Sequence, residues 1–219
     1  MERPKNLRIT QRTAIIVIIL FHVVGLVGLL LPMSRPLFLQ IVPWHLLLML
    51  LVTILTHQHF DNRFIGFMAL LFVAGVAVEW IGVHKHWLFG NYAYGKTLGV
   101  KIFDIPLTIG VNWFLLIYAA GITMQRSRLK SITARVITGA LLLVLLDLLI
   151  EPVAIHFDYW HWAEGIIPFK NYYCWFLVSA AMLFVFEKFG FKKQGIAAPV
   201  LLATEFVFFG VLGIFGIFV

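Results

Sequence analysis

Two carboxylates four residues apart interrupt one of the apolar stretches of this chain. Asp147 and Glu151 lie in the run LLLVLLDLLIEP, so on a helix they share one face, about one turn apart. A carboxylate in hydrocarbon is costly, which makes such a residue a candidate for function. Two neighbouring acids in an apolar setting favour one protonated and one ionised carboxyl, the combination that general acid–base catalysis uses.

A third acid, Glu79, follows the apolar residues 67–78 and is a candidate on the same argument. The ordinary alternative for Asp147 and Glu151 is to reach the membrane interface or to pair with a lysine or arginine. For Glu79 it is a hydrogen bond to another helix. Glu151, beside Pro152, fits the interfacial alternative best. Glu205 lies deeper in the last apolar run, and we interpret it as a bond to a neighbouring helix rather than as part of the site.

Aromatic and amide side chains follow or precede these acids in the sequence. The candidates for substrate contact are Tyr92, Tyr94, Asn112, Trp113, Trp160, Trp162, Asn171, Tyr172 and Trp175. Amides orient a water molecule, and ring faces stabilise a developing carbocation. Tryptophan and tyrosine also gather at membrane interfaces without any catalytic role, and for the individual rings both interpretations stay open.

The histidines do not have the spacing of a metal centre. His57 and His59 are expected on one side of the membrane and His84 and His86 on the other, separated by a hydrocarbon layer of about 30 Å. We therefore expect no metal. No glycine-rich phosphate loop, nucleophile elbow or dinucleotide fingerprint occurs either.

The composition indicates which elements must position these residues. The chain has 219 residues, of which 62% are hydrophobic and 12% charged, whereas soluble domains carry about a quarter charged residues. The formal net charge of +7 does not indicate nucleic acid binding, because the basic residues lie in short runs between apolar segments. The single cysteine, Cys174, excludes an internal disulfide. These features predict a polytopic membrane protein in the lipid bilayer.

We expect an all-α bundle of about seven transmembrane helices, forming a single transmembrane domain over residues 1–219. The apolar runs lie near residues 14–31, 37–56, 64–83, 104–124, 132–153, 169–188 and 196–218. With the N-terminus inside and the C-terminus outside, the inner connections hold twelve lysines and arginines and the outer ones five. This orientation places the acids together in the outer half of the membrane.

The connection over residues 82–102 is long for such a bundle. Its glycines permit turns and its aromatics suit a lid at headgroup level. Asp104 followed by Pro106 predicts a helix start, with a side-chain cap and a proline in the first turn.

The order and spacing of these residues resemble a known family over residues 75–190. The matching positions are Glu79, Gly82, Phe89, Gly90, Tyr92, Tyr94, Leu98, Gly99, Ile105, Pro106, Leu107, Asn112 and Trp113, then Asp147, Glu151, Pro152, Trp160, Trp162, Ile167, Pro168, Asn171 and Trp175. The pattern is similar to that of the CruF-type carotenoid biosynthesis proteins, which are membrane carotenoid hydratases of bacteria and haloarchaea.

The resemblance implies an enzyme in a bacterial or archaeal cell membrane, with other carotenoid biosynthesis enzymes as partners. It would add water to the terminal 1,2 double bond of a membrane-dissolved acyclic carotenoid, through a tertiary carbocation and without a cofactor. Asp147 or Glu79 would supply the proton, and Glu151 with Asn112 or Asn171 would orient water. The alternatives are an end-group cyclase or isomerase and a non-enzymatic transporter or lipid-binding scaffold.

Overall fold

The computed structural model describes residues 9–216, and the prediction of a seven-helix membrane protein is confirmed. The helices are α1 (Gln11–Leu30), α2 (Arg35–Thr56), α3 (Asn62–Lys85), α4 (Leu107–Arg126), α5 (Ile132–His156), α6 (Phe169–Phe189) and α7 (Ala197–Val211), and a short π-helix (Leu212–Gly216) extends α7. All seven spans, the last one counted to Phe215, are long and apolar enough to cross a bilayer.

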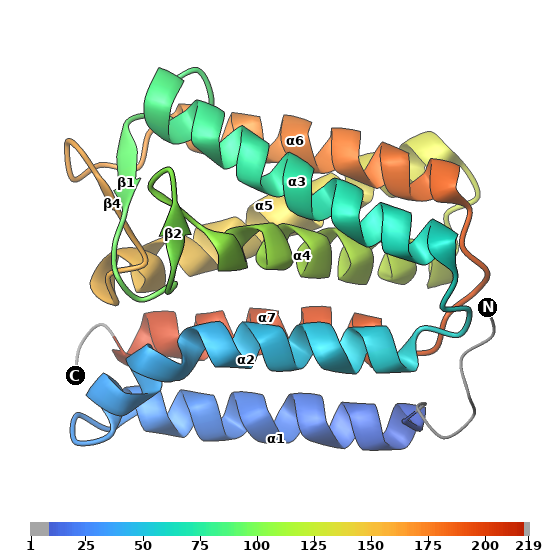
Figure 1. Cartoon of the computed structure of the whole chain (residues 1–219), viewed down its shortest axis with the longest axis horizontal. Helices are drawn as coiled ribbons and strands as arrows, with labels where there is room; N and C mark the ends of the chain where they lie inside the picture. The colour runs from blue at the N-terminus through green and yellow to red at the C-terminus, as the bar shows by residue number, and fades with distance from the viewer. Residues whose placement is uncertain (1–8, 217–219) are drawn as a thin grey trace.

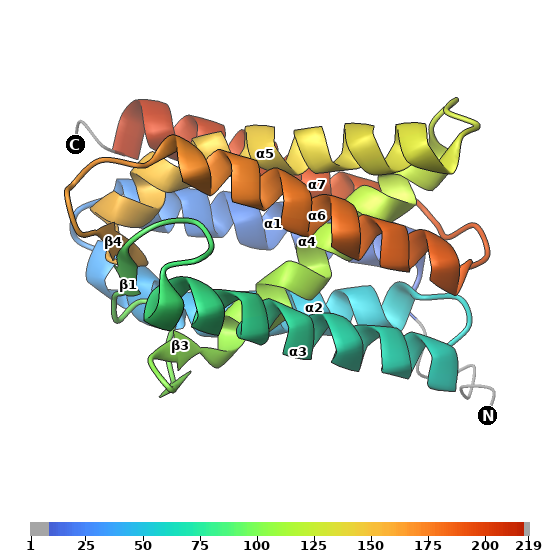
Figure 2. The ribbon, with the colours of Figure 1, turned by 90° about the horizontal axis from the view of Figure 1, so that it is seen from above.

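Helix α4 forms the centre of the bundle. In its most apolar window 78% of the residues are buried, whereas the corresponding figure for α2 is 17%. Helices α1, α2 and α7 lie on one side of α4, and α3, α5 and α6 lie on the other (Figures 1 and 2). The outward surfaces of the helices are apolar, with Leu37 59% and Val73 62% exposed, which suits contact with lipid.

A small cap closes one end of the bundle, where α3 and α5 end and α4 and α6 begin (Figure 1). Strand β1 (Tyr92–Tyr94) pairs antiparallel with β4 (Trp160–Trp162), so that Tyr92 lies opposite Trp162 and Tyr94 opposite Trp160. The connection between α3 and α4 and the connection between α5 and α6 are therefore joined to each other through backbone hydrogen bonds.

Asp158 connects the two segments of this cap, the one that contains β1 and the one that contains β4. Its carboxylate accepts the backbone N–H of Lys96 at 3.1 Å and contacts His161. Partial burial alone would raise the pKa of Asp158, but these two contacts lower it, so the side chain is ionised at neutral pH. Gly95 lies directly against the Asp158 backbone, which leaves no space for a side chain.

The predicted start of the fourth helix at Asp104 was wrong. Asp104 does not cap α4: it lies with Phe103 in the two-residue turn between β2 (Lys101–Ile102) and β3 (Ile105–Pro106), both at positive φ, and α4 begins at Leu107. A hairpin turn of this kind favours Asp, which competes with its use as a cap. Helix α5 continues through Pro152 to His156, because a proline near a helix end removes only one backbone hydrogen bond.

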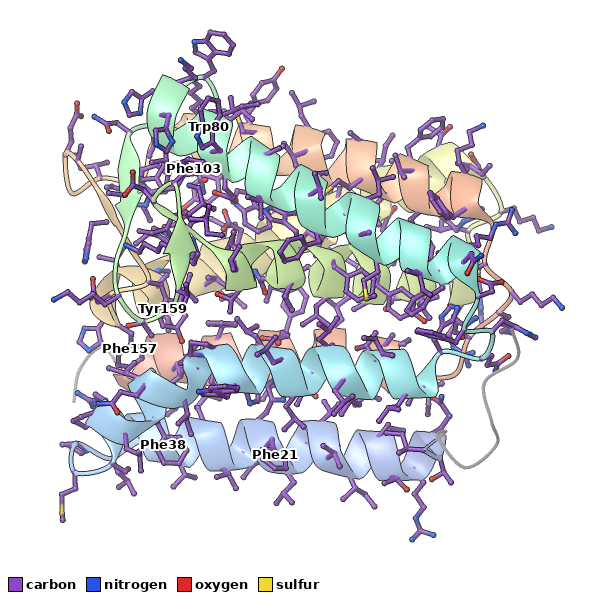
Figure 3. The ribbon with its side chains drawn as sticks, in the orientation of Figure 1. Phe21, Phe38, Trp80, Phe103, Phe157 and Tyr159 are labelled. Carbon is purple, nitrogen blue, oxygen red and sulfur yellow. The ribbon has the colours of Figure 1, made fainter. Side chains whose placement is uncertain are left out.

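Several aromatics around the cap are exposed, as an interfacial position would require. Trp80 and Phe103 project outward there (Figure 3), and Phe103 is 76% exposed. Trp87 and Phe169, at the same end, are also exposed. These rings suit the membrane–water boundary, and the aromatics that turn inward form a separate set.

Candidate active site

Glu79, near the end of α3, is held by three hydrogen bonds. Its Oε2 accepts the hydroxyls of Tyr92 at 2.5 Å and Tyr94 at 2.6 Å, and its Oε1 accepts the indole N–H of Trp113 at 2.8 Å. Burial, with Glu79 as neighbour, raises the pKa of both phenols well above the ordinary value, so both remain donors. Three donors around one buried carboxyl group suit its ionised form.

Glu151 and Asp147, on α5, meet across one amide. The Nδ2 group of Asn171 donates to Asp147 Oδ2 at 2.8 Å and to Glu151 Oε1 at 3.0 Å. Glu151 Oε2 also accepts the indole N–H groups of Trp160 at 3.1 Å and Trp162 at 2.9 Å. Both carboxyl groups are buried, so the alternative that Glu151 reaches the interface is wrong.

Asp147 differs from the other two acids in its surroundings. It is 0% exposed, and its Oδ1 has no hydrogen-bond partner among the residues that the structure describes. An enclosed carboxylate oxygen without a donor is costly, whereas a protonated carboxyl group in the same place costs less. The surroundings of Asp147 therefore favour its neutral form.

Glu79 and Glu151 border a pocket of about 30 Å³ beneath the cap. Its remaining walls include Tyr92, Tyr94, Asn112, Trp160, Trp162, Asn171 and Trp175. A cavity of this size with carboxyl and amide groups in its walls has room for one or two water molecules. The site therefore combines two carboxyl groups with a space that suits water.

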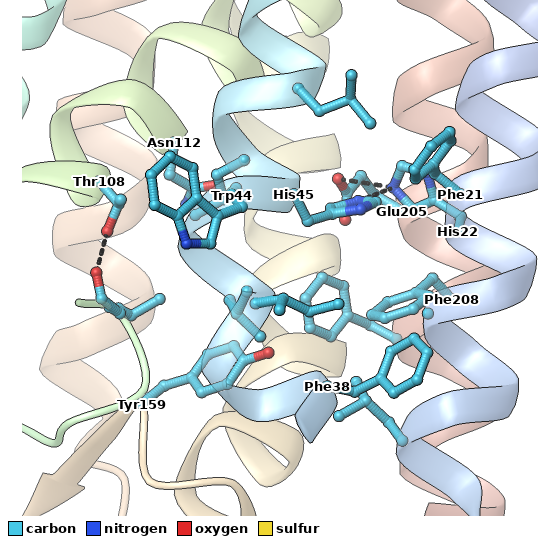
Figure 4. Close-up of a pocket in the computed structure, with 18 of the residues that line it drawn as sticks. Phe21, His22, Phe38, Trp44, His45, Thr108, Asn112, Tyr159, Glu205 and Phe208 are labelled. Carbon is cyan, nitrogen blue, oxygen red and sulfur yellow. Dashed lines mark hydrogen bonds and ion pairs between the residues drawn. The ribbon is translucent and has the colours of Figure 1, made fainter. Parts of the chain in front are cut away.

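A second, much larger cavity lies on the other side of the same wall, between α4 and the group formed by α1, α2 and α7 (Figure 4). Its volume is about 350 Å³, and most of its lining side chains are apolar. Both cavities are bordered by Ile109, Asn112, Ile150 and Trp160. The water-sized acid pocket thus adjoins a chamber that suits a hydrocarbon chain.

Most of the predicted site residues come together here, although not all of them line the pocket. Trp113 lies behind the wall, where it holds Glu79 and stacks on Trp175 with the ring centroids 4.5 Å apart. Asp147 likewise lies behind Asn171 and borders neither cavity. Tyr172 is half-buried and is absent from both walls.

Comparison with known proteins places this arrangement in a family. The family model described as "Carotenoid biosynthesis protein" matches residues 39–218. The chain belongs to this carotenoid biosynthesis protein family. The match extends beyond residues 75–190, where the sequence resemblance was seen, and includes α7 and most of α2, whereas α1 lies outside it.

A curated relative of the chain is the bisanhydrobacterioruberin hydratase of Haloarcula japonica, which is 28% identical over 126 residues. The alignment covers 54% of the present chain and 43% of the relative, so less than half of the relative's length is matched. No solved structure matches the chain. Membership of the carotenoid biosynthesis family and this distant hydratase relative support a carotenoid-modifying role.

Apart from Asn112 and Trp160, sequence reasoning missed the residues of the large cavity. Glu205 does bond a neighbouring helix, as predicted, since its Oε1 lies 3.3 Å from His22 Nε2. The same residue also lines the large cavity with His22, His45 and Tyr159. The only signal in the sequence was that these polar residues lie within apolar runs. Their proximity in space depends on the packing of α1, α2 and α7.

Proposed function

We propose that this protein is a hydro-lyase that adds water to the terminal 1,2 double bond of an acyclic carotenoid end group in a bacterial or archaeal cell membrane. The observation that carries the proposal is the junction of the acid pocket with the large apolar cavity. A hydrocarbon chain in the large cavity would bring its end to the wall formed by Asn112, Ile150 and Trp160. Water would occupy the small pocket.

The distribution of donors supports a division of roles between the acids. No lysine or arginine is among the residues described as walls of the acid pocket, so two neighbouring carboxylates there would lack a compensating cation. Glu79 has the shorter hydrogen bonds and suits the ionised form. We assign the proton to the Asp147–Glu151 pair, with Glu151 as the member that borders the pocket.

The reaction then requires two proton transfers. Glu151 gives its proton to C2 of the alkene, which leaves a tertiary cation at C1. The nearby ring of Trp160 stabilises this cation through its face. Water bonds to C1 and loses a proton to Glu79, and Asn112 orients that water. A proton returns from Glu79 to Glu151 before the next cycle, and both groups border the same small pocket.

The assignment differs from the prediction made from sequence, in which Asp147 or Glu79 gave the proton and Glu151 helped to orient water. Asp147 lies behind Asn171, so we propose that it acts through Glu151. The two groups would share one proton across the Asn171 amide that donates to both. Asp147 is neutral when it holds that proton, and when the proton is on Glu151 the negative charge of Asp147 opposes ionisation of Glu151. Asp147 is therefore a positioning residue in this proposal.

Incubation with an acyclic carotenoid in water labelled with heavy oxygen tests the proposal. The purified protein in lipid vesicles should convert the substrate to a tertiary alcohol that contains the labelled oxygen. A product of unchanged mass would instead indicate a cyclase or isomerase, which quenches the same cation by ring closure or proton loss. An unchanged substrate, with the protein folded, would contradict both enzymatic proposals.

A further inference from the structure

The large cavity contains a polar cluster that the proposed hydration does not use. His22 of α1, His45 of α2 and Glu205 of α7 converge there (Figure 4). His22 Nε2 lies 3.3 Å from Glu205 Oε1 and 3.4 Å from His45 Nε2. His22 is only 3% exposed, and the neighbouring wall is apolar, with Phe21 and Phe208 beside the cluster.

Hydrogen-bond chemistry limits the states of this cluster. His22 Nδ1 lies 2.7 Å from the carbonyl of Ile18, and because a carbonyl only accepts, this nitrogen carries a hydrogen. A lone carboxylate in an apolar cavity is costly, so Glu205 is either neutral or paired with a protonated His22. The cluster is then neutral as a whole in both states.

Two polar atoms of the cluster remain available. Glu205 Oε2 and His45 Nδ1 have no hydrogen-bond partner within residues 9–216, and neither atom is enclosed by protein. In the same part of the chain, no three His, Cys, Asp or Glu side chains are placed to hold a metal ion. A ligand that bonds both atoms must have a hydrogen-bonding group, and the rest of it must suit an otherwise apolar cavity.

We propose that His45 and Glu205 bind a hydroxyl group on an otherwise hydrocarbon isoprenoid chain in the large cavity. A hydroxyl both donates and accepts, so it can satisfy the Glu205 oxygen and the His45 ring together. The inference rests on the proposed function for the identity of the substrate class, and it adds that the preferred substrate is already hydroxylated. An earlier oxygen-introducing reaction must then supply that substrate.

The position of the cluster limits where the hydroxyl lies. His22 is eight residues before the end of α1, about 12 Å from the capped end of the bundle at the helical rise per residue. Glu79 is six residues before the end of α3, about 9 Å from the same end. The hydroxyl site is therefore slightly deeper than the acid pocket and lies across the cavity from it.

Competition binding tests the inference independently of catalysis. A conjugated carotenoid bound to the protein in detergent should quench tryptophan fluorescence, and an acyclic diterpene alcohol or the matching hydrocarbon should displace it. We expect the alcohol to bind about tenfold more tightly to the wild-type protein, as for one additional hydrogen bond. Glu205→Leu and His45→Phe should lose this preference, and Glu205→Gln should keep most of it.

The exposed His59, outside the cavity, provides a matched control, and His59→Leu should behave as the wild type. Equal affinity of the wild type for the alcohol and the hydrocarbon would overturn the inference. An unchanged preference in both Glu205→Leu and His45→Phe would also overturn it. Because binding is measured, a retained preference without any hydration would contradict the proposed function alone.

Discussion

At the scale of single residues, the three acids differ in the number and type of their donors. Glu79 accepts from two phenols and an indole, and Glu151 accepts from two indoles and an amide. Asp147 accepts from Asn171 only and has one enclosed oxygen without a partner among the described residues. The three carboxyl groups therefore favour different protonation states, because their hydrogen-bond donors differ.

Replacement of each acid by its amide should separate these roles. We expect Glu151→Gln and Glu79→Gln to lower hydration by about a hundredfold to ten-thousandfold, because each removes a proton donor or acceptor of the reaction. Asp147→Asn should have a smaller effect on the rate and should shift the pH dependence of kcat, because it acts through Glu151. The measurement is the rate of alcohol formation in vesicles, with thermal unfolding as a check on folding.

Tyr92→Phe serves as the matched comparison, because it removes one of three donors to Glu79 and no proton-transfer group. An effect of Tyr92→Phe as large as that of Glu79→Gln would contradict the base role of Glu79. Full activity of Asp147→Asn with an unchanged pH profile would remove Asp147 from the mechanism.

At the scale of elements, the cap converts two loops into one wall of the acid pocket. Strand β1 provides the tyrosines that hold Glu79, and β4 provides the indoles that hold Glu151. Pairing of the two strands therefore fixes the donors of both acids relative to each other. The connection over residues 82–102, which was predicted as a lid, pairs with β4 through Tyr92–Tyr94 and forms one wall of the acid pocket.

Gly95→Ala should disrupt this wall. The new Cβ would overlap the backbone carbonyl of Asp158, so the two sides of the cap must move apart. We expect hydration to fall by about a hundredfold, as a displacement near 1 Å in a catalytic arrangement commonly causes. The helices should remain inserted and folded. Gly66→Ala is the control, since no atom lies within 4 Å of its Cβ position, and equal activity of the two variants would contradict the role of the cap.

At the scale of the whole molecule, the arrangement of seven helices produces two adjoining cavities of different chemistry. Helix α4 contacts α2 and α7 on one side and α3, α5 and α6 on the other, and its residues Ile109 and Asn112 border both cavities. The charge distribution further predicts that the capped end faces outward. The acid pocket would then lie in the outer leaflet.

Cysteine labelling in intact cells tests this orientation. Cys174 is buried, so the wild-type protein should not react. Glu164→Cys, at the exposed connection between β4 and α6, should react with a membrane-impermeant maleimide in intact cells. Arg128→Cys, between α4 and α5, should react only after permeabilisation. The reverse pattern would invert the orientation.

The sequence by itself determined the membrane class, the seven spans and the candidate acids, because hydropathy, span length and the cost of intramembrane charge are local properties. It also provided most of the aromatic and amide partners. Tertiary structure alone decided which acid borders the pocket, since that depends on how α5 and α6 pack around Asn171. The pairing of β1 with β4 and the meeting of His22, His45 and Glu205 likewise join residues far apart in the chain, which no local pattern specifies.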